Sequence, residues 1–131
     1  MASNKTLVFS IAFISCVFIV QPEAEAGCDT SKARAYSINL STQAKSPIDQ
    51  GLVTECGNMS GAFISFKGRK LDFGWDQCLN YCNEGFIPGK LYVRVGKTFK
   101  QGSGERDGRE KACMQQFGSA TMYCHEVLRD N

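Results

Sequence analysis

The stretch Asp72–Gly85, with the sequence DFGWDQCLNYCNEG, decides the expected fold because it combines a helical pattern with two cysteines. Trp75, Cys78, Leu79 and Cys82 have the i, i+3, i+4, i+7 spacing of one buried helical face. The stretch begins at a residue type that caps helices and ends at a glycine, which often follows the last helical turn. We therefore predict a helix over Asp72–Gly85 that its cysteines tie to other parts of the chain.

The number of cysteines predicts a domain held together by disulfides. Of the seven cysteines, Cys16 lies in the N-terminal segment and the others follow it, namely Cys28, Cys56, Cys78, Cys82, Cys113 and Cys124. An even number in a small exported chain is typical of a disulfide framework rather than a metal site, because export favours oxidation. Sequence alone does not choose among the pairings. We exclude only a bridge between Cys78 and Cys82, which would strain a regular helix.

The N-terminus has the features of a secretory signal peptide. Lys5 supplies a positive charge, Leu7–Val20 is uninterruptedly apolar, and Ala24–Ala26 provides an A-x-A cleavage site. The apolar run is shorter than the roughly 20 residues that span a bilayer, and no later run could act as an anchor. We therefore expect residues 1–26 to be removed and residues 27–131 to form a single secreted, extracellular, cysteine-rich domain.

Alternating apolar and polar residues, or short β-prone runs, predict strands in the rest of the chain. They fall at Ala33–Ser41, Leu52–Cys56, Ala62–Phe66, Leu91–Lys100 and Ser119–Leu128. In the first of these strands, the residues expected to face inward are Tyr36, Ile38 and Leu40. In the fourth, the residues expected to share the inner face are Leu91, Val93, Val95 and Phe99.

A second helix is predicted from Asp107 through Phe117. The sequence from Asp107 to Glu110 has the spacing of a capping box, and Cys113 and Phe117 share a helical face four residues apart. The glycine-rich stretch Gln101–Gly104 before it is expected to be mobile. The resulting order of elements, β-β-β-α-β-α-β, predicts an α+β fold in which two short helices pack on one face of a mainly antiparallel sheet.

No catalytic constellation is visible in the sequence. His125 is the only histidine, which excludes a two-histidine acid–base pair, and no G-x-S-x-G elbow is present. We interpret His125 as a strand or surface residue beside a disulfide. Asp72 could pair with Glu105 or Glu110 as carboxylates do in glycosidases, but the spacing selects no pair. We therefore assign no catalytic residue, metal or cofactor, and expect a binding protein rather than an enzyme.

Basic and aromatic residues form the predicted partner-binding site. Without Lys5, Glu23 and Glu25 the chain has a net charge of about +3, which permits attraction to anionic surfaces. It lacks the dense basic clustering expected of a nucleic-acid-binding protein. If the turns that carry these side chains meet in space, they form a cationic patch with an aromatic neighbour. The predicted partner-binding residues are Lys67, Arg69, Lys70, Tyr92, Arg94 and Arg106.

Two sequons predict N-linked glycosylation. Asn39 is followed by Leu40 and Ser41, and Asn58 is followed by Met59 and Ser60. Both triplets lie in or beside predicted strands and turns, where the asparagine side chain can remain on the surface. We therefore predict that Asn39 and Asn58 are glycosylated.

These patterns favour a secreted, disulfide-rich interaction protein of toxin, defence or effector type. We expect a monomer that acts on a protein, a glycan or an anionic surface of a target cell, without a transmembrane anchor and without specific nucleic-acid binding. Two alternatives stay open. One is a small exported hydrolase of nuclease or glycosidase type that uses His125 or a carboxylate, and the other is a carrier whose phenylalanines line a cavity for a small apolar ligand.

Overall fold

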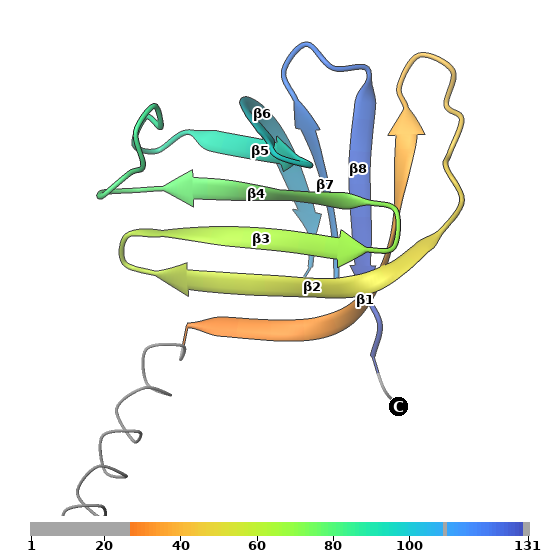
Figure 1. Cartoon of the computed structure of the whole chain (residues 1–131), viewed down its shortest axis with the longest axis horizontal. Coiled ribbons are helices and arrows are strands. Elements are labelled where there is room, and N and C mark those ends of the chain that lie inside the picture. Colours follow the sequence, from red (N-terminus) through yellow and green to blue (C-terminus); the bar gives the residue numbers. More distant parts are fainter. Residues whose placement is uncertain (1–26, 109, 130–131) are drawn as a thin grey trace, which may run out of the picture.

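Antiparallel pairing of each strand with the next one along the chain closes the protein into an eight-stranded barrel (Figure 1). The computed structural model describes residues 27–108 and 110–129, so the predicted signal peptide lies outside the described residues. The last strand pairs with the first, which closes the barrel. The strands are β1 (Cys28–Asn39), β2 (Asp49–Asn58), β3 (Gly61–Gly68), β4 (Asp72–Cys78), β5 (Leu91–Val95), β6 (Thr98–Asp107), β7 (Lys111–Gln116) and β8 (Thr121–Val127).

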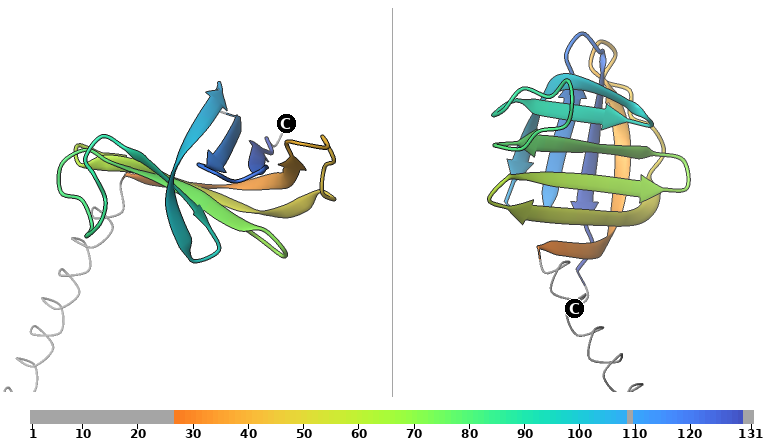
Figure 2. Two further views of the ribbon diagram at one scale, coloured as in Figure 1. Left: turned by 90° about the horizontal axis from the view of Figure 1, so that it is seen from above. Right: turned by 60° about the vertical axis from the view of Figure 1, so that its left-hand side comes forward.

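The barrel is flattened into two layers of strands that cross each other (Figure 2). Strands β2 to β5 run side by side in one layer, and β6 to β8 run across them in the other. Strand β1 bends and belongs to both layers, because its residues Cys28–Ala35 pair with β2 while Ala33–Asn39 pair with β8. Side chains from the two inner faces therefore meet between the layers and fill the barrel.

Buried side chains from both layers meet in the core, including Phe66 and Phe73 from one layer and Met114 from the other. Phe66 and Phe73 are fully buried with ring centroids 5.2 Å apart, and Phe73 also lies 5.2 Å from the ring of Tyr123. Ala33 and Ala35 of β1 are buried against this cluster and leave room for the rings. Phe66 and Phe73 therefore pack inside the core, which is not what a carrier with a phenylalanine-lined cavity requires.

The predicted α+β fold is wrong, because every regular element of the described residues is a strand. The helix predicted over Asp72–Gly85 is strand β4 followed by a loop. Its residues alternate, with Phe73 and Trp75 toward the core and Asp76 toward the outside. Gly74 lies so close to the carbonyl of Ile64 that a Cβ atom would be 2.3 Å from that oxygen, so the strand pairing requires a glycine at this position. Within a helix, the same glycine would be destabilising. Pairing with β3 and β5 overrides the local helical spacing.

The helix predicted from Asp107 through Phe117 is also wrong. Asp107 ends β6, Gly108 has a positive φ of 68° in the turn, and Lys111–Gln116 forms β7. Asp-Gly between two alternating segments is a hairpin signal, and it outweighs the capping-box spacing. The stretch Gln101–Gly104, predicted to be mobile, lies within β6 and pairs with β5 and β7.

Two strands were predicted with the wrong geometry. Leu91–Lys100 is a hairpin rather than one strand, because Gly96 adopts a φ of 59° and turns the chain. Phe99 consequently pairs with Arg94 on the outer face and is 46% exposed. In β1 the side chains of Ala33 and Ala35 face inward, so Tyr36 and Ile38, which were predicted to face inward, lie on the outer face. The β1–β2 loop turns back and pairs along β1 through Ile38 and Lys45, and the Lys45 ammonium group lies 5.2 Å from the centre of the Tyr36 ring, which partly covers that outward side chain.

The prediction that the six cysteines after residue 26 form disulfides is confirmed, but the exclusion of a bridge between Cys78 and Cys82 is wrong. Cys28–Cys56 and Cys113–Cys124 each join directly opposed residues of neighbouring strands. Cys78 bonds to Cys82 because the chain leaves the strand at Cys78 and turns, which brings the two Cα atoms to 5.3 Å. Three disulfides indicate an oxidising, extracellular-type environment. None of the described residues belongs to a helix long and apolar enough to cross a membrane.

Candidate binding groove and barrel mouth

The predicted basic site is divided between different parts of the barrel. Lys67 is the penultimate residue of β3, and Arg69 and Lys70 lie in the exposed β3–β4 turn. Arg94 and Arg106 lie on other strands, and Arg106 is near the opposite end of the barrel from the β3–β4 turn. The structure therefore does not bring the predicted residues together into one patch.

Two of the predicted arginines are bound to acidic side chains. The Arg94 guanidinium donates to Asp72 at 2.7 Å, to the Ser65 hydroxyl at 2.8 Å and to the Gly96 carbonyl at 2.7 Å. Arg106 lies 2.6 Å from Glu55 across the mouth of the barrel. Both guanidinium groups therefore already have counter-charges, which weakens their attraction to an anionic partner.

Tyr92 was predicted to be exposed, yet it is 6% exposed because the β4–β5 loop covers it. Its hydroxyl accepts a hydrogen bond from the backbone N–H of Ile87 at 2.6 Å and donates to the carbonyl of Gly85 at 3.3 Å. The ring of Phe86 stacks on the Tyr92 ring, with centroids 4.0 Å apart and planes 6° apart. Tyr92 therefore positions the loop and is not itself available to a partner.

The β4–β5 loop, residues 79–90, is held at both ends and forms one wall of a groove. The Cys78–Cys82 disulfide closes its first turn, and the N–H of Gly89 donates to the carbonyl of Cys78 at 2.8 Å. The N–H of Leu79 donates to the carbonyl of Ser60 at 2.7 Å, which joins the loop to the β2–β3 turn. A loop of this length would otherwise be mobile, so these contacts give the groove a defined wall.

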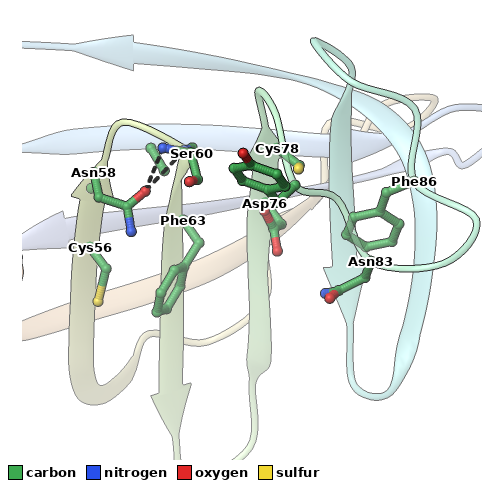
Figure 3. A pocket seen from close by; sticks show the side chains of 12 residues that line it. Cys56, Asn58, Ser60, Phe63, Asp76, Cys78, Asn83 and Phe86 are labelled. Atoms are coloured by element: carbon green, nitrogen blue, oxygen red, sulfur yellow. Dashed lines mark hydrogen bonds between the residues drawn. The ribbon is translucent and has the colours of Figure 1, made fainter. Parts of the chain in front are cut away.

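The groove lies on the outer face of β2, β3 and β4, at the end of the barrel that carries the β2–β3 turn (Figure 3). Its volume is about 170 Å³. A neighbouring hollow of about 260 Å³ shares Phe63 and Asp76 with it and continues toward Phe99. The groove is lined by Cys56, Gly57, Asn58, Ser60, Gly61, Ala62, Phe63, Asp76, Cys78, Tyr81, Asn83 and Phe86. We call this site the aromatic groove.

Rings and polar side chains alternate along the aromatic groove. Phe63 is 40% exposed and Tyr81 is 90% exposed, although both are large aromatic residues. Asp76 lies between Phe63 and Tyr92 in the strand register, on the same outer face. Burial raises the pKa of Asp76 above its ordinary value, because a partly desolvated carboxylate is less stable in its charged form. The carboxyl group would therefore gain from a ligand that donates hydrogen bonds to it.

Sequence reasoning missed most of this groove. It placed Asp76 on a solvated helix face and Phe86 in an unassigned segment, because the loop contacts that bring them together are not visible locally. The one usable signal was the Asn58 sequon, which the structure places at the rim of the groove. The second sequon, at Asn39, lies at the far end of β1.

The barrel mouth is a second concave site and is polar. A cavity of about 660 Å³ is lined by Asp29, Ser31, Glu55, Arg106, Val127, Leu128 and Arg129. Beside it, His125 is 1% exposed and its Nδ1 atom has no hydrogen-bond partner among the described residues. Burial lowers the pKa of His125 to about 4, the Glu55 carboxylate opposes this change and Arg106 adds to it. His125 is therefore neutral at pH 7, and it is a buried strand residue rather than a surface one.

The described residues place no recognisable catalytic centre around His125. All six described cysteines are in disulfides, so none is a free thiolate nucleophile. No cluster of three or more His, Cys, Asp or Glu side chains that could hold a metal ion occurs within residues 27–108 and 110–129. Asp72, one of the carboxylates weighed as a glycosidase acid, is bound by Arg94.

Comparison of the chain with protein-family models, with curated proteins and with solved structures gives no match. The fold and sites define a small, disulfide-bonded, closed antiparallel barrel. A fold of this kind does not by itself define a function, which depends on sites such as the aromatic groove.

Proposed function

We propose that this chain is a secreted interaction protein of toxin, defence or effector type that recognises a neutral glycan on its target. The observation that carries the proposal is the composition of the aromatic groove. The exposed rings of Phe63 and Tyr81 and the half-buried ring of Phe86 line a concave surface together with the side chains of Asp76 and Asn83. Exposed aromatic residues in a hollow with a few polar groups are typical of a ligand site.

The polar groups of the groove suit hydroxyl groups better than they suit a single charge. Asparagine amides and the Ser60 hydroxyl both donate and accept hydrogen bonds, and Asp76 accepts them. Sugar hydroxyls also donate and accept hydrogen bonds, so they can use both kinds of group in the groove. A lysine or arginine side chain of a partner would only donate hydrogen bonds and would leave the donors of the groove unused. The flat apolar face of a sugar ring can lie against an aromatic ring. A volume of about 170 Å³ is below the range of pockets that enclose drug-sized ligands, so the groove takes one ring at a time.

A glycan partner is favoured over an anionic surface by the placement of the charges. Asp76 is the only charged side chain among the residues that line the aromatic groove. The basic residues of the predicted partner-binding site lie elsewhere, and two of them, Arg94 and Arg106, are paired with carboxylates. An anionic sugar or lipid would therefore meet a like charge in the groove, while a neutral sugar would not.

The proposal is tested by titrating unglycosylated protein with neutral oligosaccharides. We would use the trimer of N-acetylglucosamine and maltotriose as probes, and a heparin fragment as the anionic comparison, with isothermal titration calorimetry as the readout. The informative variants are Phe63→Ala and Asp76→Asn. The matched control is Phe117→Ala, because Phe117 is also an exposed phenylalanine, at 61%, but lies in the β7–β8 turn away from the groove.

We expect at least one neutral oligosaccharide to bind, and Phe63→Ala and Asp76→Asn each to weaken it tenfold or more. Phe117→Ala should leave the affinity within twofold of the unchanged protein. If heparin alone bound, and lost affinity on removal of Lys67, Arg69 and Lys70, the basic residues rather than the groove would be the partner site. Neutral binding that was indifferent to Phe63 and Asp76 would also defeat the proposal.

A further inference from the structure

The Asn58 sequon is built into the rim of the aromatic groove. Asn58 ends β2, and its Oδ1 atom accepts hydrogen bonds from the backbone N–H groups of Ser60 at 2.7 Å and Gly61 at 3.2 Å. These bonds fix the side chain, so its orientation is defined. Asn58 and Met59 are exposed, which leaves the triplet accessible to a glycosylating enzyme.

The atom that would carry a sugar points along the groove. Figure 3 shows the Asn58 amide with its oxygen bonded toward Ser60 and its nitrogen directed toward the space between Cys56 and Phe63. Asn58 pairs with Gly61, two residues before Phe63 on the same face, so no side chain separates the amide from the Phe63 ring. N-linked glycans are attached through this nitrogen.

We infer that Asn58 is N-glycosylated and that the first sugar of its glycan occupies the aromatic groove, against Phe63. The inference rests on the proposed function, because it assigns to the chain's own glycan the site that would otherwise bind a neutral glycan of the target. A tethered sugar has a high effective concentration at the groove and would exclude an added oligosaccharide. Glycosylation at Asn58 would then determine whether the groove is open to a partner.

Asn39 provides a control within the same chain. Its Oδ1 atom also accepts two backbone hydrogen bonds, from Ser41 at 2.9 Å and Thr42 at 3.1 Å. The two sequons therefore share their local geometry. They differ in their surroundings, because Asn58 lines the aromatic groove, whereas Asn39 lines neither that groove, nor the hollow beside it, nor the barrel mouth. A glycan on Asn39 should leave the groove open.

The test uses the full chain secreted from a eukaryotic host. Intact mass and glycopeptide mapping show whether Asn58 is occupied. An endoglycosidase then cuts each glycan back to its first N-acetylglucosamine, and the trimer of N-acetylglucosamine and maltotriose serve as the added probes. The variants are Ser60→Ala, which removes the Asn58 sequon but keeps the backbone N–H that fixes Asn58, and Asn39→Gln. Because Ser60 lines the groove, Ser60→Ala is also prepared without glycosylation and compared with the unglycosylated unchanged chain, which measures the effect of the lost hydroxyl separately.

We expect Asn58 to be occupied, and protein with a single sugar there to bind the probe at least tenfold more weakly than Ser60→Ala. Asn39→Gln should behave as the unchanged protein does. An unmodified Asn58, or equal binding by the Asn58-glycosylated protein and Ser60→Ala, would overturn the inference and leave the proposed function standing.

If no form binds the probes, the proposed function fails, and nuclear magnetic resonance decides the inference separately. The N-acetyl methyl or ring protons of a sugar that lies on Phe63 are shielded by its ring, and the shielding should disappear in Phe63→Ala. Shielding that depends on Phe63 would support the inference, whereas unshielded sugar protons would contradict it.

Discussion

Protonation of the buried His125 should make the barrel markedly less stable in mild acid. Burial lowers its folded-state pKa to about 4, against an ordinary value of 6.5. Between these two values the unfolded chain binds a proton that the folded chain does not, so the free energy of unfolding falls as the pH falls from 6.5 to 4. At 1.36 kcal/mol for each pKa unit, the loss amounts to about 3 kcal/mol, and it levels off below pH 4.

Guanidinium denaturation at a series of pH values from 4 to 8, with the disulfides intact, measures this loss. His125 is the only histidine, so His125→Gln removes all histidine titration, and subtracting its pH profile isolates the effect. Asp76 titrates with the opposite sign, because its raised pKa stabilises the fold in acid, and it contributes equally to both profiles. The subtracted profile should rise by about 3 kcal/mol between pH 4 and pH 6.5. Parallel profiles, differing by less than about 1 kcal/mol across this window, would refute the burial argument.

Three further predictions concern the core, the groove loop and acid unfolding. Phe73→Ala removes a fully buried ring and should lower the free energy of unfolding by about 3–5 kcal/mol, as measured by chemical denaturation. Replacing both Cys78 and Cys82 with alanine opens a bridge that spans only four residues, so the stability loss should be smaller than for Cys28–Cys56. That double variant should nevertheless bind neutral oligosaccharides more weakly, and unchanged affinity would show that the bridge does not shape the groove. Hydrogen bonds from the N–H groups of Leu71 and Lys70 hold the pKa of Asp49 below its usual value, so its stabilisation is present above pH 3.8 and lost below it. Asp49→Asn should therefore flatten the acid limb of a circular-dichroism unfolding profile, and an unaltered limb would contradict this.

The sequence by itself determined the features that depend on residue type and local alternation. Disulfide bonding of the cysteines could be predicted from their number. The strands at Leu52–Cys56 and Ala62–Phe66 could be predicted as short, β-prone runs, and each lies within an observed strand. The sequons could be located from three residues each. The cysteine composition also indicated the oxidising environment that the three disulfides support.

Only the tertiary structure decided the fold class and the groove, because both depend on contacts between distant residues. Asp72–Cys78 carries apolar side chains that fit a helix face or a strand equally well over so short a stretch, and pairing with β3 and β5 selects the strand. The pairing ends at Cys78, where the chain turns, so that Cys78 can form a disulfide with Cys82. A regular helix over the same residues would not allow this bond. The aromatic groove forms only when three strands and the disulfide-closed β4–β5 loop come together and place Asp76, Phe63 and Phe86 side by side. The strands form here because every strand of a closed barrel must hydrogen-bond its backbone N–H and C=O groups to a neighbour on each side. This requirement, rather than the local spacing of apolar residues, determines the fold.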